Sequence, residues 1–306
     1  AEYIIYINMM TWPVASLGFV ITMIQRASAS VERLHRILDR EPDVADGPRT
    51  ESSIQSIEGR IAFHNVWYQY EEEDEPALRG VSFELEADET LAIVGRTGAG
   101  KSTLVRMIPR LLDPDAGRVT IDGHDVSTIP LATLRQHMGY VPQEVFLFSD
   151  TVANNIAFGA LEATDDEIRA AAREADLLEN VEDFPDGFET FVGERGITLS
   201  GGQKQRTSIA RALIRDPRVL IFDDALSAVD TATERNILRS LRERQGSHTL
   251  VLVSHRLSAV QSADLILVME QGKIVQRGTH EELVEQDGLY ADLHEKQLLE
   301  EEIEAL

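Results

Sequence analysis

The chain has 306 residues, 43% of them hydrophobic, which is enough for one large domain with an appendage or for two domains. Its 53 acidic and 29 basic residues give a formal net charge of −24, which disfavours nucleic acid as a partner because phosphate backbones attract basic surfaces. Cysteine is absent, so disulfides and thiol-ligated metals are excluded, as fits a reducing compartment.

The basic residues are themselves uneven, with four lysines against 25 arginines. Heavy acid content with scarce lysine fits adaptation to high salt, where the self-repulsion of the chain is screened. Compositional drift in a GC-rich genome produces the same pattern, and the sequence leaves both explanations open.

Residues 3–24 carry no charge, and this run is long enough as a helix, about 33 Å, to cross a bilayer. Four arginines from Arg26 to Arg40 follow it, which is the basic flank expected on the cytoplasmic side. A secretory signal is disfavoured because only Glu2 precedes the run, and a buried helix of a soluble protein is the other alternative. We expect residues 1–40 to be the end of a transmembrane helix with its cytosolic extension. The start without Met indicates a fragment of a longer membrane protein.

The helix is expected to stop near Glu41, because a residue that precedes proline avoids the helical region. The polar segment 41–60 contains Gly47-Pro48 and is predicted to be a linker. Alternating strand patterns follow at 61–70 and 81–86, and they predict antiparallel pairing.

A parallel α/β core is predicted by short apolar runs that alternate with helical patterns. These runs are 91–95, 138–141, 219–223 and 249–253. Residues 150–215 are mostly helical by pattern, and a final hairpin is expected to pair 264–269 with 273–277 around Gln271-Gly272. The tail 291–306 is predicted to be an acidic, solvated helix.

A phosphate-binding motif follows the first of these runs, where GRTGAGKST at 95–103 matches G-x-x-x-x-G-K-[ST]. Its glycines let backbone amides fold around phosphate oxygens, and the next helix offers its positive N-terminus to the same anion. Lys101 is expected to reach the β- and γ-phosphates, and Ser102 to hold Mg²⁺. The predicted nucleotide site comprises Gly95, Arg96, Thr97, Gly98, Ala99, Gly100, Lys101, Ser102 and Thr103.

Two adjacent carboxylates end the apolar run VLIF at 219–222. A solvated strand end is one interpretation, but a phosphate-binding loop needs an acid on a neighbouring strand to engage Mg²⁺. We predict that Asp223 binds the metal and that Asp224 lies beside the γ-phosphate and the attacking water.

The segment LSGGQKQR at 199–206 resembles the signature motif of ATP-binding cassette (ABC) ATPases, although an ordinary glycine-containing helix start is the alternative. Further motifs follow in family order. The resemblance implies that Tyr70 stacks on adenine, that Gln143 in YVPQEVFLF is the Q-loop glutamine near the metal, and that His255 is the switch histidine. Asp230 in SAVD resembles the D-loop aspartate. Taken one at a time, Tyr70 could be an ordinary strand aromatic, Gln143 could cap a loop, and His255 could be a hydrogen-bonded histidine at a strand end.

Two further segments resemble the exporter branch of this family. FVGERG at 191–196 resembles the X-loop, which implies that Glu194 faces coupling helices of a membrane domain. Residues 12–38 resemble the end of the last transmembrane helix of an exporter half. The implied fold class is α/β, a P-loop NTPase core of ABC type with an antiparallel β subdomain and a helical subdomain (about 150–215), all within 61–290.

The resemblance also implies a dimer on a membrane, with the nucleotide-binding domain on the cytoplasmic side of the inner or plasma membrane. ATP would lie between the phosphate-binding loop of one subunit and the signature of the other, so the partners are a second half-transporter and both transmembrane domains. The signature residues are Leu199, Ser200, Gly201, Gly202 and Gln203.

Asp224 departs from the family pattern, which places glutamate there as general base. A carboxylate one methylene short predicts good ATP binding and slow hydrolysis. A heterodimer with one weak and one competent site is therefore favoured, and a nucleotide-sensing regulatory subunit is the alternative. A DNA-repair ATPase head is disfavoured, because only about 95 residues separate Lys101 from Leu199 and leave no room for a long coiled coil. The activity that the resemblance implies is export of a drug, lipid or peptide across a membrane, driven by ATP binding and hydrolysis.

Overall fold

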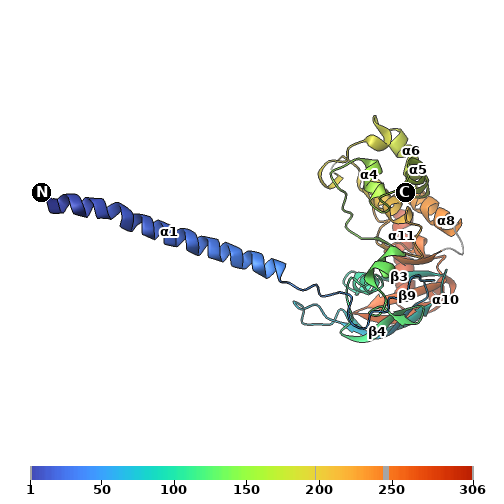
Figure 1. Ribbon diagram of the computed structural model, residues 1–306. Coiled ribbons are helices and arrows are strands. Elements are labelled where there is room, and N and C mark those ends of the chain that lie inside the picture. Colours follow the sequence, from blue (N-terminus) through green and yellow to red (C-terminus); the bar gives the residue numbers. More distant parts are fainter. Residues whose placement is uncertain (1, 197, 244–247, 305–306) are drawn as a thin grey trace. The chain divides into compact units, whose positions relative to one another are not determined.

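A computed structural model describes residues 2–196, 198–243 and 248–304 (Figure 1). The chain divides into two compact units, residues 1–45 and residues 46–306, which are taken separately below.

The first unit is one long helix, α1 (Glu2–Leu38), with Pro13 inside it. None of its described residues is buried, and the helix is long and apolar enough to cross a membrane, with a mean hydropathy of 1.6 over its most apolar window. The hydroxyls of Thr11 and Thr22 donate to backbone carbonyls four residues earlier, at 2.9 Å each, so that these polar groups are satisfied inside the helix. A core helix of a soluble protein would instead bury most of this apolar surface.

The second unit contains a four-stranded antiparallel sheet with the order β2-β1-β4-β5. The predicted pairing of the first two strands agrees with the structure, in which β1 (Ile61–Tyr68) is antiparallel to β2 (Leu78–Leu85). The other two strands, β4 (Ala116–Ile121) and β5 (His124–Asp125), were not predicted.

A six-stranded sheet with the order β10-β9-β3-β8-β7-β6 forms the centre of this unit. All of its pairings are parallel except the predicted hairpin of β9 with β10. The strands are β3 (Thr90–Gly95), β6 (Met138–Val141), β7 (Val219–Asp223), β8 (Thr249–Val253), β9 (Leu265–Glu270) and β10 (Lys273–Gly278).

Two hydrophobic clusters cover the two faces of this sheet. On β7, Leu220 and Phe222 enter the cluster with the helical segment, whereas Val219 and Ile221 enter the cluster with the antiparallel sheet. Because successive side chains of a strand point to opposite faces, burial on both faces requires the continuous apolar run seen in the sequence.

The helices complete the unit, and Figure 1 shows α4, α5 and α6 gathered away from β3, β4 and β9. Thr164 and Ser200 each begin a helix with a capping box, in which side chain and backbone satisfy each other's hydrogen bonds. The helices are α2 (Lys101–Met107), α3 (Leu131–Gln136), α4 (Val152–Ala157), α5 (Asp165–Glu174), α6 (Leu178–Glu182), α7 (Gly201–Leu213), α8 (Thr231–Glu243), α9 (Leu257–Val260), α10 (His280–Glu285) and α11 (Leu289–Glu304), with 3₁₀ turns at Gly187–Glu189 and Glu194–Gly196. The last two residues of the predicted tail helix lie outside the described residues.

Candidate nucleotide site

The predicted phosphate-binding loop joins the end of β3 to the start of α2. Gly95 has a φ of 147°, and a Cβ at this position would lie 2.2 Å from the Met269 carbonyl oxygen. Gly100 has a φ of 96°, and a Cβ there would lie 2.5 Å from the Ala77 carbonyl oxygen. Both positions therefore need glycine for conformation and for space. No side chain caps the helix that follows, which leaves its first amides available to an anion.

Lys101 is 6% exposed and folds back onto the loop. Its Nζ donates to the carbonyl oxygens of Gly95 at 2.8 Å and Arg96 at 3.0 Å. Burial lowers the pKa of this ammonium group, while the nearby carboxylates of Asp224 and Asp223 act in the opposite direction. A phosphate would offer the same ammonium group stronger, charge-assisted partners.

Asp223 ends β7 and is 1% exposed. The Ser102 hydroxyl donates to its Oδ1 at 2.8 Å, and the Tyr140 hydroxyl donates to its Oδ2 at 3.2 Å. Burial, together with the Asp223 charge, raises the pKa of Tyr140 to about 12, so this phenol remains a donor. A hydroxyl oxygen and a carboxylate oxygen from two separate elements are thus already adjacent.

This oxygen pair fits Mg²⁺, a hard cation that proteins hold by one or two carboxylates while substrate phosphates and water complete its shell. Among the described residues, no group of three or more histidines, cysteines or acids could hold a metal ion. The residues present therefore fit a metal that is bound together with phosphate.

Asp224 follows directly and is oriented differently, with its backbone in the left-handed region at a φ of 53°. Its amide donates to the Val253 carbonyl oxygen at 3.1 Å. Burial raises the pKa of this carboxyl, and the electrostatic effect of His255 is the largest of those that oppose it. A carboxylate with a raised pKa is a better proton acceptor than an ordinary surface aspartate.

These side chains line one cavity of about 440 Å³, within the range typical of small-molecule sites. It unites most of the predicted nucleotide and catalytic residues, although they come from segments far apart in the sequence. They are Tyr70, Thr97, Gly98, Ala99, Gly100, Lys101, Ser102, Thr103, Gln143, Asp223, Asp224 and His255.

Comparison with known proteins agrees with this geometry. Residues 78–227 match the family described as ABC transporter. The chain carries the nucleotide-binding domain of the ABC transporter family. The predicted fold class is thereby confirmed. Residues 1–77, which include α1 and β1, precede the matched segment.

The ABC domain and the helix before it also resemble longer proteins. A probable multidrug resistance ABC transporter ATP-binding/permease protein, YheI of Bacillus subtilis (strain 168), is 43% identical over 96% of this chain and 50% of its own length. The ATP-dependent lipid A-core flippase of Escherichia coli (strain K12) is 44% identical over 93% of this chain and 49% of its own length. The structure of a bacterial Atm1-family ABC exporter with ATP bound matches with a TM-score of 0.85 at 40% identity, over 96% of this chain and 51% of that one. The chain thus spans about half the length of these relatives.

Tyr70 lies on the wall of the ABC domain's cavity. Its hydroxyl and that of Thr103 on α2 are 3.2 Å apart, and its ring meets Tyr68 edge to face with 4.9 Å between ring centroids. The ring is therefore held at both ends in a position where a base could stack on it.

The five signature residues do not line this cavity. Ser200 caps α7: its hydroxyl accepts from the Gln203 amide at 3.2 Å, while the Gln203 side chain accepts from the Ser200 amide at 2.9 Å. Gly202 lies against the segment 227–230, since a Cβ there would be 3.0 Å from the Ala228 carbonyl oxygen. Asp230 caps α8 through the amides of Ala232 and Thr233, both at 3.0 Å. Leu199 is buried, whereas Ser200, Gly201, Asp230 and Glu194 are exposed.

Several cavity residues were missed by the sequence analysis. The loop between β1 and β2 contributes one wall, and the β9–β10 turn contributes Gln271 and Gly272. The turn itself was predicted, but nothing in the sequence connects it with the phosphate loop. The amide of Arg79 donates to the Gly272 carbonyl oxygen at 2.8 Å, which joins the two walls. The residues are Glu73, Glu75, Pro76 and Ala77 of the loop and Arg79 at the start of β2.

Proposed function

We propose that the chain is the ATP-binding and ATP-hydrolysing part of a membrane exporter, in which closure of two nucleotide-binding domains on ATP drives transport. The observation that carries this proposal is the cavity in which Lys101, the Ser102–Asp223 pair and Asp224 converge. The relatives named above include a lipid flippase and a probable multidrug transporter, and an amphipathic drug, lipid or peptide is the substrate class that we propose. α1 belongs to the membrane part and the ABC domain to the cytoplasmic side.

Each cavity residue has a role in this proposal. Tyr70 stacks on adenine, the loop amides with Lys101 bind the phosphates, and Asp224 accepts a proton from the attacking water with His255 beside it. Bound Mg²⁺, held by Ser102, Asp223 and Gln143, would neutralise charge on the phosphate oxygens. Asp230 and Glu194 face the second subunit and the membrane domain, respectively.

The signature residues serve the site of a second subunit, since Ser200 and Gly201 are exposed at the start of α7 and away from the cavity. Their amides and the Ser200 hydroxyl would bind the phosphates that the partner's loop holds. The functional unit is therefore a dimer of half-transporters.

Asp224 leads to a finer proposal, which is that this chain's own site is slow. The aspartate carboxylate is one methylene short of the family's glutamate, and misplacement on the order of 1 Å can cost about 10²-fold in rate. A heterodimer in which the partner supplies the faster site follows from this, and a symmetric homodimer that tolerates Asp224 is the alternative. Measuring ATP hydrolysis by the assembled protein distinguishes both dimers from a nucleotide-sensing subunit that does not hydrolyse ATP.

Binding of Mg-ATP to the full-length protein in lipid nanodiscs tests the function. We expect Lys101→Ala to weaken ATP affinity by about 10- to 100-fold, because it removes charge-assisted hydrogen bonds worth about 1.5–3 kcal/mol. Lys273→Ala, which changes an exposed lysine on β10, is the matched control and should bind ATP as the unaltered protein does. Equal affinities for the two variants would reject the nucleotide site.

A further inference from the structure

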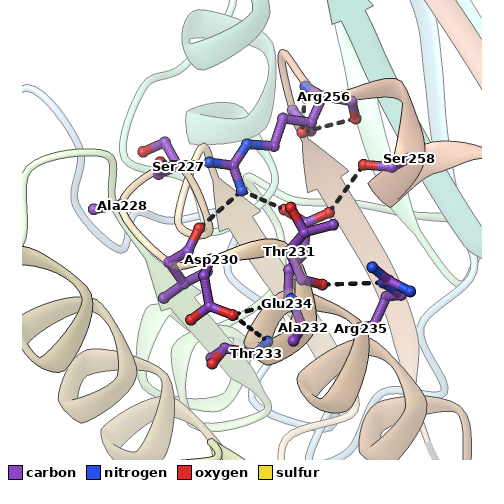
Figure 2. Close-up of polar contacts among 12 residues, drawn as sticks. Ser227, Ala228, Asp230, Thr231, Ala232, Thr233, Glu234, Arg235, Arg256 and Ser258 are labelled. Atoms are coloured by element: carbon purple, nitrogen blue, oxygen red, sulfur yellow. Dashed lines mark hydrogen bonds and ion pairs between the residues drawn. The ribbon is translucent and has the colours of Figure 1, made fainter. Parts of the chain in front are cut away.

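Glu234 on α8 is 1% exposed, although no step proposed above uses its carboxylate. A buried charge costs several kcal/mol unless it is paired and hydrogen-bonded. Figure 2 shows its partners: the Arg256 guanidinium donates to Oε2 at 3.0 Å, and the Ser258 hydroxyl donates to Oε1 at 3.3 Å. Both carboxylate oxygens are thus committed to the segment that follows His255.

Arg256 extends this contact to the segment 227–230, which contains the D-loop aspartate (Figure 2). The same NH1 donates to the Val229 carbonyl oxygen at 2.8 Å, and NH2 donates to that of Ser227 at 3.3 Å. The backbone of Arg256 is itself fixed, because its amide donates to the Ser254 hydroxyl at 2.9 Å. The orientation of the guanidinium therefore determines where two carbonyl groups of the D-loop segment lie relative to the switch histidine.

The opposite side of this segment is held by α7. Gln205, which is 5% exposed, donates to the Ser227 hydroxyl at 3.1 Å and accepts from the Ala228 amide at 2.9 Å. The Ser227 hydroxyl in turn donates to the Asp224 carbonyl oxygen at 2.9 Å. A continuous set of contacts therefore joins the signature helix to the general base position on one side and to the switch segment on the other.

We infer that Glu234 and Arg256 are positioning residues: Glu234 orients the Arg256 guanidinium, which holds the D-loop segment 227–230 at a fixed place between His255, Asp224 and the signature helix. The expected effect of this pair on catalysis rests on the proposed function, whereas its expected effect on the position of the segment does not. Neither residue lines the nucleotide cavity, so the expected effect falls on turnover and not on ATP affinity.

Arg256→Met in the full-length protein in nanodiscs is the first test. We expect kcat to fall on the order of 10²-fold, because a displacement of about 1 Å in the catalytic groups costs that much, while ATP affinity stays within about twofold. Arg235→Met is the matched control, since Arg235 is an exposed arginine on α8, the helix of Glu234, and in Figure 2 it contacts only the Thr231 carbonyl oxygen. A kcat for Arg256→Met equal to that of the control would overturn the inference, and so would a parallel loss of ATP affinity.

The double variant Glu234→Met with Arg256→Met separates positioning from stability. Each single change leaves an unpaired charge and lowers Tm, whereas apolar replacement of both partners restores Tm because no buried charge remains. We expect turnover to stay low in the double variant. Recovery of both Tm and turnover would assign the pair a structural role only and overturn the inference.

Hydrogen exchange of a peptide that covers 225–231 gives a result independent of hydrolysis. Arg256→Met should speed exchange of these amides by at least about tenfold, with α5 unchanged as the internal reference. Unchanged exchange overturns the inference even if the protein is an ATPase. Faster exchange in a protein that neither binds nor hydrolyses ATP would instead reject the proposed function and leave the positioning of the segment intact.

Discussion

Asp223 and Asp224 are adjacent, but their surroundings differ in ways that suit two tasks. Asp223 is 1% exposed and accepts hydrogen bonds from Ser102 and Tyr140. Asp224 is half-buried, and burial raises its pKa. Its φ of 53° also favours the residue found there, since aspartate adopts the left-handed region more readily than longer side chains do. The aspartate therefore fits the backbone conformation at this position.

Asp224→Glu should raise ATP turnover at this chain's own site by about tenfold or more, because the carboxylate regains the reach that a general base needs. The measurement is single-turnover hydrolysis by the full-length protein with saturating Mg-ATP. Asp224→Asn is the control and should abolish the remaining turnover, since an amide accepts no proton. An unchanged rate for Asp224→Glu would show that Asp224 is already an adequate base.

Tyr70→Ala should weaken ATP binding by about 1–3 kcal/mol if the ring stacks on adenine. Tyr70→Phe, which keeps the ring but loses the hydroxyl contact with Thr103, should retain most of the affinity. Titration with ATP and GTP checks both changes, and Tyr70 would be a bystander if neither affinity nor their ratio changed.

At the scale of elements, the central strands were predictable because burial on both faces leaves a continuous apolar run, as in 219–222. β4 was not predictable in this way, since its first three residues are exposed and AGRVTI carries little apolar pattern. The cavity wall from the β1–β2 loop was missed for another reason, because only tertiary contacts bring it to the phosphate loop.

The burial of Glu234 could have been predicted from the sequence. Glu234 shares helical spacing with Ile237, Leu238 and Leu241, all buried, which places an acid on an apolar face.

The junction of α10 and α11 contains a polar pair, the buried Tyr290 and the half-buried His280. The Tyr290 hydroxyl is 2.8 Å from Nδ1 of His280. Burial raises the pKa of Tyr290 to about 12, so the phenol stays neutral. Burial also lowers the pKa of His280; neighbouring His294 adds to this effect, and Glu281 opposes it.

This pair predicts a pH dependence of stability. Because the folded-state pKa of His280 lies below its unfolded value of about 6.5, the stability it contributes is present above pH 6.5 and is lost as pH falls through the folded pKa. We expect Tm of the unaltered protein to fall more steeply between about pH 7 and pH 5 than Tm of His280→Gln. His124→Gln, which changes an exposed histidine on β5, is the control. Parallel pH profiles for the protein and His280→Gln would contradict the assignment.

At the scale of the whole molecule, the two halves of an ATP site lie on one chain but do not meet. The phosphate loop, Asp223 and Asp224 line the cavity, whereas Ser200 and the signature glycines lie elsewhere in the ABC domain. Under the proposed function, a second copy or a related subunit would complete each site, and the contacts around 227–230 would lie between the two surfaces. The net charge of −24 adds repulsion between such copies, which salt would screen.

The measurement that tests the composite site most directly is steady-state ATP hydrolysis by the assembled full-length transporter with Ser200→Ala, alongside its ATP affinity. The account predicts that turnover falls on the order of 10²-fold, as when one preorganised donor to a transition state is removed, while ATP binding at this chain's own loop is retained. Turnover within about twofold of the unaltered transporter would contradict the claim that the signature of this chain completes an ATP site of its partner.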